Sequence, residues 1–520
     1  MRSMARGKRK PLAGTLARVE GLLTGLYGSR YNPVHHSGPL VSVLLLVLLA
    51  TGLYLLLFYR IGTPYESTAA ITNQVWGGRW IRSLHRFASD AAVVAIVVHA
   101  LKMFLQGRSW GPRALAWVSG GVLLFVFLVC GWTGYVLVWD VQAQVLAIEG
   151  ARVLDVMPIL SEPLSRTFVG EGELPRAFFF MNLFLHVALP MALGLLLWLH
   201  VGRLSRPKLM PPRSVSWSLV GLLTFAAIVW PVTIAPEADL FRLPERAPYD
   251  FFFSFWIPIA RVLPPAGVWI VVGAVALAML LVPLLTRPPR DRRPLPAVVD
   301  ERLCTGCEQC ARDCPYEAIT MIERTDGRAA LVARVDSSLC VSCGICAGSC
   351  APMVVGPPDR TGRDQLAGVK RFVADRQPGP RDVVIIGCTS GAGGVGAFER
   401  FNDALVMPIR CAGSLHTSVV EYLVRAGAGG VMVVSCPAAD CRNREGAQWL
   451  EARLFHEREA ELQARVDRRR GRWVVAGAGE RSTVMRGLKD FRQSLPGAAY
   501  PDGEIDLLAL CERAPDEVAP

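Results

Sequence analysis

The sequence predicts a multidomain protein with an all-α bundle of six transmembrane helices, a small α+β domain and an α/β domain with a parallel sheet. Three observations predict this fold class. Six apolar runs long enough to cross a bilayer precede residue 286. Two runs of four cysteines lie between residues 304 and 350. After residue 383, apolar strand-like segments alternate with helical patterns, which is typical of a parallel sheet.

Composition narrows the class of protein. At 520 residues the chain is too long for one domain, and its hydrophobic content is 52% against 19% charged residues. The net charge of +12 does not point to nucleic acid, because no basic run is combined with stacking aromatics in a recognised module. Nothing resembles a cleavable signal peptide, so the fourteen cysteines fit metal-bound thiolates in a reducing cytoplasm better than disulfides.

The apolar runs and the basic residues beside them predict a membrane topology. Residues 14–28 form a short amphipathic stretch that we expect to lie on the inner surface. The six apolar runs occupy residues 39–58, 83–105, 114–137, 177–201, 216–235 and 264–285. Basic residues gather in the second and fourth connections and after the sixth run. We therefore expect a protein of the inner (cytoplasmic) membrane of a prokaryote, with both termini in the cytoplasm.

Four of the eight histidines lie inside apolar runs. His85 and His99 share the second run, and His186 and His200 share the fourth; both pairs are separated by 14 residues. This spacing places each pair on one helix face, about 21 Å apart along the axis. Ionisable side chains inside a span mark functional sites. Neutral imidazoles that face each other across a bundle can ligate haem iron from both sides.

Because of these histidines, the chain resembles the cytochrome b of bc1 and b6f complexes from about residue 31 to 285. The resemblance implies that His85 and His186 hold an outer haem b, and His99 and His200 an inner one. Arg82, which precedes His85 in RSLH, stands where the family places a haem-propionate arginine. The family also suggests a homodimer, which no residue pattern requires. Glycines that would let the porphyrin approach the backbone are Gly38, Gly52, Gly120 and Gly134.

The same resemblance implies a quinone as diffusible substrate. The family's outer-site motif PEWY is replaced here by PYDF at 248–251, so the usual glutamate is missing. Asp250 is either a substitute proton acceptor or a solvated loop carboxylate. At the inner face, His35, His36 and Arg203 are candidates for proton chemistry at a quinone. For the two histidines, hydrogen bonds to water or lipid headgroups are the alternative.

The two cysteine runs each read C-x2-C-x2-C-x3-C, the bacterial pattern for a pair of [4Fe-4S] clusters. In that pattern the last cysteine of each run ligates the other cluster. A structural zinc site is the alternative, but eight thiols in two identical registers favour clusters. This segment resembles a two-cluster ferredoxin. One cluster would take Cys304, Cys307, Cys310 and Cys350, and the second Cys340, Cys343, Cys346 and Cys314.

Three strand-like segments in the last part of the chain end in a cysteine: Cys388, Cys411 and Cys436. With Cys441 they converge on the carboxyl edge of the predicted sheet, where ligands collect. Four thiolates suit a [2Fe-2S] cluster or zinc, and buried inert cysteines are a further alternative. SCPAADCRNREG and RCAGSLH resemble the delta subunit of methyl-viologen-reducing hydrogenase over about 383–495. This resemblance favours [2Fe-2S], although one cysteine of the family's first C-x-x-C motif is missing.

We expect six segments. They are a cytochrome b-like membrane domain (1–286), a linker (287–299), a ferredoxin domain with two [4Fe-4S] clusters (300–355), a second linker (356–382), a hydrogenase delta-subunit-like domain (383–500) and a tail (501–520).

Together these patterns predict an electron-transfer subunit of a quinone-linked oxidoreductase complex. Electrons would pass between a cytosolic redox partner and the quinone pool through one [2Fe-2S], two [4Fe-4S] and two haem b groups. By resemblance the partner is a heterodisulfide reductase-like flavoprotein or another dehydrogenase that docks on the C-terminal domain. Two alternatives stay open: quinol-driven reduction of a low-potential cytosolic acceptor, and a non-redox membrane anchor for a soluble complex.

Overall fold

The computed structural model gives the placement of most of the chain. It describes residues 2–157, 163–168, 174–202, 206–242, 250–328, 330–389, 391, 404–455, 458, 460–477 and 479–495, with the backbone alone for residues 2–13. Arg203, residues 248 and 249 of the PYDF motif and the tail 501–520 lie outside the described residues.

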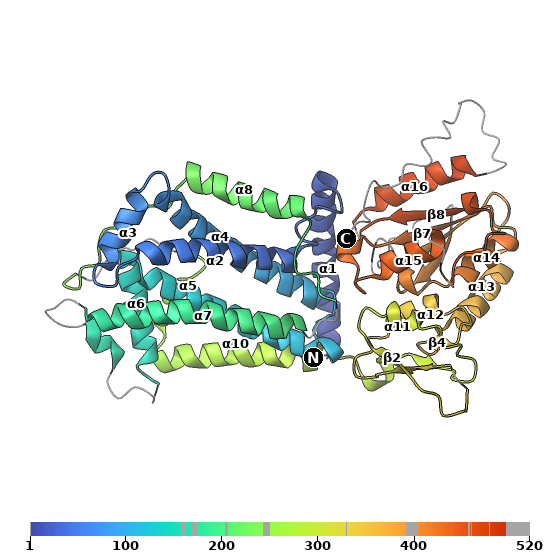
Figure 1. Cartoon of the computed structure of the whole chain (residues 1–520), viewed down its shortest axis with the longest axis horizontal. Helices are drawn as coiled ribbons and strands as arrows, with labels where there is room; N and C mark the ends of the chain where they lie inside the picture. The colour runs from blue at the N-terminus through green and yellow to red at the C-terminus, as the bar shows by residue number, and fades with distance from the viewer. Residues whose placement is uncertain are drawn as a thin grey trace.

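The first half of the chain is a bundle of helices that run side by side (Figure 1). Among the described residues, five helices are long and apolar enough to cross a membrane. They are α2 (Ser37–Phe58), α4 (Gly78–Leu105), α5 (Ala114–Val136, preceded by a 3-10 turn from Gly111), α7 (Arg176–Gly202) and α10 (Pro265–Thr286). Helix α2 packs on α4, and α5 packs on α7.

The fifth predicted span is shorter than its apolar run. Helix α8 (Arg213–Val229) has 17 residues, about 25 Å, against a hydrocarbon thickness of about 30 Å. It ends here because Pro231 follows Trp230, and a proline disfavours helical geometry at the residue before it. The sequence run continued to residue 235, so hydrophobicity alone overestimated the helix.

Smaller elements close the two ends of the bundle. Helix α1 (Arg2–Tyr27) runs across the end of the bundle that faces the two smaller domains, which is the end predicted to be the inner one (Figure 1). At the opposite end lie α3 (Pro64–Asn73) and α6 (Val141–Leu154) (Figure 1), and α9 (Ile257–Val262) packs against α6.

The cysteine-rich segment is a small α+β domain. Strand β1 (Val298–Val299) pairs antiparallel with β4 (Val355–Gly356), and β2 (Ile319–Ile322) pairs antiparallel with β3 (Val332–Val335). Two short helices, α11 (Gln309–Arg312) and α12 (Ile345–Ser349), each carry the third cysteine of one run, Cys310 and Cys346. Each short helix and the loop before it therefore present the first three thiols of a run to one site.

The C-terminal domain contains a four-stranded sheet of order β6-β5-β7-β8 in which all pairings are parallel. Strands β5 and β7 are buried along their whole length, as expected for central strands with helices on both faces. Its elements are β5 (Val383–Cys388), β6 (Leu405–Ile409), α14 (Thr417–Arg425), β7 (Gly430–Ser435), α15 (Gly446–Phe455), β8 (Gly471–Val475) and α16 (Arg481–Ser494).

The segment 356–382, expected to be a linker, contains helix α13 (Gly362–Arg376). Val369 is fully buried and packs in one hydrophobic core with Val419 and Val420. Thr361 begins the helix with a capping box, in which its hydroxyl accepts from the Asp364 backbone N–H. Because its flanks are rich in proline and glycine, this helix was not predicted from the sequence. In the structure it covers one face of the C-terminal domain.

Thr361→Ala should lower the free energy of unfolding of this domain by about 1 kcal/mol, because it leaves orphan N–H groups at the start of α13. Thr361→Ser keeps a hydroxyl and should be close to wild type. Hydrogen exchange of residues 362–376 in the intact protein measures the difference. Equal protection in both variants would show that the cap does not stabilise the helix.

Candidate redox sites

His85 on α4 and His186 on α7 face each other inside the bundle. Their ring centroids are 6.4 Å apart and the ring planes are inclined by 63°. Because a metal–imidazole bond is about 2 Å long, this separation admits one metal ion between the two rings. The pair therefore fits axial ligation of a haem iron, which accepts and donates single electrons when bound.

Hydroxyl groups on neighbouring helices fix the orientation of the imidazoles. The Thr51 hydroxyl lies 2.8 Å from His85 Nδ1, and the Ser119 hydroxyl 2.9 Å from His200 Nδ1. Each hydroxyl also donates to a carbonyl of its own helix, so it accepts from the ring N–H. His186 Nδ1 is held by a carbonyl at 3.0 Å and a threonine hydroxyl at 3.1 Å. The Nε2 lone pair of each ring is thus left for a metal.

The four predicted glycines each face a histidine ring rather than open space. A Cβ atom at these positions would lie 2.7–3.4 Å from the Cε1 atom of that ring. Glycine is therefore required so that the imidazole can stand upright against the neighbouring helix. The pairs are Gly38 with His99, Gly52 with His85, Gly120 with His200 and Gly134 with His186.

The sequence contains a second pattern, separate from the histidine spacing, that marks the four glycine positions. Each glycine directly follows a serine or threonine, and the dipeptides on each helix are 14 residues apart, as the histidines are. The dipeptides are Ser37-Gly38 and Thr51-Gly52 on α2, and Ser119-Gly120 and Thr133-Gly134 on α5.

Two predicted residues at the outer end have protein partners. Arg82 donates to the Val232 carbonyl at 3.0 Å. Asp250 is 8% exposed and forms an ion pair with Arg86, which also pairs with Asp90. The alternative that Asp250 is a solvated loop carboxylate is therefore wrong. Its carboxylate is held by an arginine that also has a second acidic partner.

The inner-face histidines are buried and bonded to the backbone. His35 Nδ1 donates to the Ser29 carbonyl at 3.1 Å, and His36 Nε2 donates to the Arg30 carbonyl at 2.7 Å. Burial lowers the pKa of both rings. Both bonds go to protein carbonyls, where the alternative interpretation placed water or lipid headgroups.

A buried charged cluster next to His35 was missed at the sequence level. Its members are Glu20 on α1, Lys102 on α4 and Asp440 in the C-terminal domain. The Lys102 ammonium lies 3.1 Å from the Glu20 carboxylate and 2.7 Å from that of Asp440. Ligand atoms of Glu20, His35 and Asp440 are close enough to share a cation, and Lys102 supplies that positive charge. No sequence pattern joins positions 102 and 440.

In the ferredoxin-like domain the eight thiols line two separate cavities. One cavity is lined by Cys304, Cys307, Cys310 and Cys350, and the other by Cys314, Cys340, Cys343 and Cys346. Each cavity thus receives three thiols from one run and the last thiol of the other. Backbone N–H groups at 3.4 Å donate to the sulfur atoms of Cys314, Cys340 and Cys350.

Burial, together with the neighbouring thiols, raises the pKa of Cys310 to about 12. Burial likewise raises the pKa of Cys343 to about 12. Four such thiols cannot all ionise in one cavity unless positive charge lies between them. The iron ions of a cluster supply that charge, so the donor sets fit iron–sulfur clusters.

The four cysteines predicted at the sheet edge of the C-terminal domain come together. Cys388, Cys411, Cys436 and Cys441 are all buried. A hydrogen bond with the Cys436 thiol, opposed by burial, lowers the pKa of Cys441 to about 7. A Cβ atom at Gly446 would lie 2.8 Å from the Cys411 sulfur, so glycine leaves room there. Four convergent thiols suit both [2Fe-2S] and zinc.

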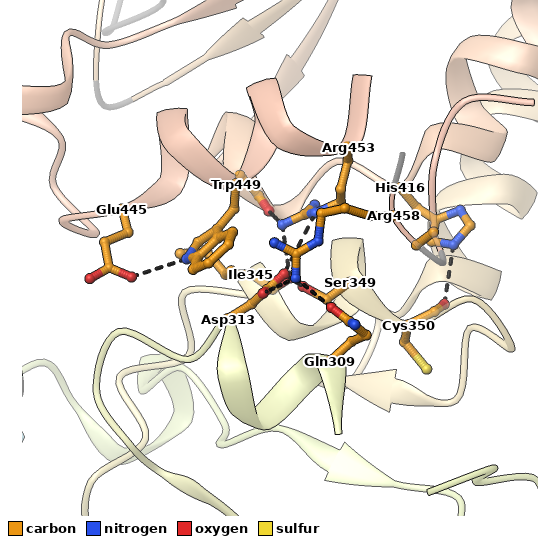
Figure 2. A network of polar contacts seen from close by, with 12 residues as sticks. Gln309, Asp313, Ile345, Ser349, Cys350, His416, Glu445, Trp449, Arg453 and Arg458 are labelled. Atoms are coloured by element: carbon orange, nitrogen blue, oxygen red, sulfur yellow. Dashed lines mark hydrogen bonds and ion pairs between the residues drawn. The ribbon is translucent and has the colours of Figure 1, made fainter. Parts of the chain in front are cut away.

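A buried polar network joins the ferredoxin-like and C-terminal domains (Figure 2). Arg453, 1% exposed, donates to the carbonyls of Gly413 and Leu415 at 2.9 and 3.1 Å, and to that of Ile345 at 3.5 Å. Asp313, also buried, accepts from the neighbouring Arg458 at 2.6 Å. The Arg453 side chain thus ties the turn after Cys411 to the helix that carries Cys346.

His416 makes a second link between these domains. Its Nε2 atom donates to the Cys350 carbonyl at 3.2 Å, as Figure 2 shows. Burial lowers the pKa of His416 to about 4, so the ring is neutral at pH 7. The two domains therefore share a buried, hydrogen-bonded interface beside their cysteines.

Gly134→Ala should displace His186 and reduce the haem content to about half, because one of two axial ligand pairs is disturbed. The measurement is the haem-to-protein ratio and the b-type α-band of the purified protein. Gly194→Ala on α7 is the matched control, since a Cβ there meets nothing within 4 Å. Full haem content in the Gly134→Ala protein would contradict the axial role of His186.

Comparison with known proteins matches three segments of the chain to protein families. Residues 25–206 match the family model described as cytochrome b/b6/petB. Residues 303–353 match the 4Fe-4S dicluster domain, and residues 382–497 match the methyl-viologen-reducing hydrogenase, delta subunit.

Individual relatives match the membrane part. The menaquinol:cytochrome c reductase cytochrome b subunit of Bacillus subtilis (strain 168) is 28% identical over 155 residues, which is 28% of this chain and 69% of that protein. Cytochrome b6 of Porphyra purpurea is 30% identical over 185 residues, 33% of this chain and 84% of that protein. A chain of the solved hyperthermophilic respiratory Complex III has a TM-score of 0.40 and 17% identity, covering 50% of this chain and 78% of its own.

The matched segment contains His85, His99, His186 and His200 and the four glycines that face them, and it spans most of the length of these relatives. The two further matches extend the chain with a cluster-binding module and a hydrogenase-subunit module. The chain belongs to the cytochrome b family, as a fusion of a cytochrome b with a 4Fe-4S dicluster domain and a domain of the methyl-viologen-reducing hydrogenase delta-subunit type.

Proposed function

We propose that this protein is a membrane-bound electron-transfer subunit that passes electrons between a cytosolic redox partner and the quinone pool. The observation that carries the proposal is the His85–His186 pair, whose rings face each other at 6.4 Å with fixed Nδ1 atoms. A bundle that only anchored a soluble complex would have no use for two imidazoles in this geometry.

The full cofactor set of the proposal is two haem b, two [4Fe-4S] and one [2Fe-2S]. The haem ligands are His85 with His186 and His99 with His200. The four thiols that line each ferredoxin cavity hold one [4Fe-4S] cluster. The four cysteines of the C-terminal domain hold the [2Fe-2S] cluster. The menaquinol:cytochrome c reductase relative supports a quinone as the membrane substrate.

The chain's own residues hold the sites and exclude water from them. Thr51, Ser119 and Thr133 keep the imidazoles in the metal-binding tautomer. The proposal takes α8 as a short sixth span and, from the charge bias of the connections, assigns both smaller domains to the cytoplasmic side. The delta-subunit match supports a partner of the hydrogenase or heterodisulfide reductase-like class.

For the quinone itself, the inner face is favoured over the outer one. At the outer end Asp250 is already paired with Arg86. At the inner end His35 and His36 are neutral and lie directly before α2, whose Gly38 faces His99. Each neutral ring donates its one N–H to a backbone carbonyl, so a quinol bound there would meet the other ring nitrogen as a proton acceptor beside the inner histidine pair.

A short-chain quinol added to the oxidised, purified protein should reduce the b-type α-band. His85→Ala/His99→Ala removes one ligand from each pair and should abolish the band, whereas His416→Gln, outside the bundle, should keep it. No α-band even with dithionite would establish the anchor alternative. A band that appears with dithionite and not with quinol would overturn the link to quinone.

A further inference from the structure

The inner end of α4 is joined to the C-terminal domain by a buried ion pair. Lys102 Nζ lies 2.7 Å from Asp440 Oδ1, and both side chains are 4% exposed. Gln106 donates to the same carboxylate oxygen at 3.2 Å. Lys102 is three residues after His99 on α4, about 4.5 Å along the axis. The C-terminal domain therefore contacts the helix that carries an inner histidine, close to that histidine.

The next contact involves a cysteine of the four-thiol site itself. Arg108, in the connection that follows α4, donates to the Cys441 carbonyl at 3.2 Å. Arg113, at the start of α5, donates to the Arg442 carbonyl at 3.4 Å. Lys102 near the end of α4, with Arg108 and Arg113 in the connection after it, thus holds the segment that contains Asp440 and Cys441.

On its other side, the four-thiol site adjoins the second ferredoxin cysteine set. A Cβ atom at Gly344, next to Cys343, would lie 3.0 Å from the Ser414 side chain in the turn after Cys411. Arg453 bonds this turn and the carbonyl of Ile345, next to Cys346, from one guanidinium group. The four-thiol site therefore has the ferredoxin cysteines on one side and the membrane helix on the other.

We propose that the four-cysteine site of the C-terminal domain is the last soluble redox site before the membrane, between the second ferredoxin cysteine set and the His99–His200 pair. Arg108 and Lys102 are the positioning residues that hold it there. The inference rests on the proposed function. In each transfer the soluble site loses one electron, and the haem iron goes from the ferric to the ferrous state.

Direct transfer from the ferredoxin domain is the rival. That domain also reaches the bundle, through a hydrogen bond between Arg113 and the Tyr316 hydroxyl. Tyr316 is two residues from Cys314. The two routes differ in one testable respect, because only the proposed route needs the four-thiol site.

The experiment follows haem reduction by reduced methyl viologen in the full chain, after mixing under anaerobic conditions. Each viologen radical cation gives one electron and becomes the dication. Reduction that survives in Cys307→Ala/Cys343→Ala does not pass through the ferredoxin clusters and is subtracted. The test variants are Arg108→Gln and Cys436→Ala/Cys441→Ala. Arg108→Lys is the conservative variant, and Lys208→Met, an exposed basic residue of the next inner connection, is the control.

Arg108→Gln should slow haem reduction by about tenfold, the usual effect of losing a residue that orients a metal site. Cys436→Ala/Cys441→Ala removes two of the four thiols and should slow it at least as much. The electron paramagnetic resonance signals of the [4Fe-4S] clusters should be retained, which reports that the ferredoxin domain is folded. In Arg108→Gln the four-cysteine site should also lose the enhanced spin relaxation caused by the nearby ferric haem. Arg108→Lys should restore most of the rate, and Lys208→Met should match wild type.

Wild-type rates in the Cys436→Ala/Cys441→Ala protein, with the [4Fe-4S] signals intact, would overturn the inference in favour of direct transfer. Unchanged spin relaxation in Arg108→Gln would overturn the positioning role. Haem that stays oxidised in the wild-type protein while its clusters are reduced would instead overturn the electron-transfer function on which the inference rests.

Discussion

A histidine ring can stand between two packed helices only where the facing helix carries no side chain. This steric constraint organises the membrane half of the protein. Gly38, Gly52, Gly120 and Gly134 supply the space, and the hydroxyl residue before three of them supplies the hydrogen-bond acceptor that fixes the ring. Helices α2 and α5 thus provide the surfaces on which the histidines of α4 and α7 rest, and these are the helix pairs that pack together: α2 on α4 and α5 on α7.

The basic residues of the inner connections have two physical uses. Lys102, Arg108 and Arg113 are part of the charge bias in the sequence that predicts the orientation of the chain in the membrane. In the folded protein the same side chains hold the C-terminal domain through Asp440 and two backbone carbonyls. Removing one partner of such a buried pair is costly, because the other charge remains without compensation.

Much of the fold and of the sites could be predicted from the sequence because the signals are local. The histidine spacing, the cysteine registers and the strand-terminal cysteines each lie within a short window. The Lys102–Asp440 contact could not be predicted, since it joins positions 338 residues apart in different domains. Helix α13 was missed because proline and glycine flank it, and its burial depends on Val369 meeting α14. The length of α8 was overestimated because hydrophobicity does not register Pro231.

The Arg453 network bears on how the protein is assembled in the cell. Arg453 closes the interface over the turn after Cys411 and the helix that carries Cys346, and both of these cysteines are buried. A carrier protein that delivers iron and sulfide needs access to those thiols. If both sites hold clusters, as proposed, their delivery would precede the closing of the two smaller domains against each other, so maturation factors would act on a more open chain than the finished protein.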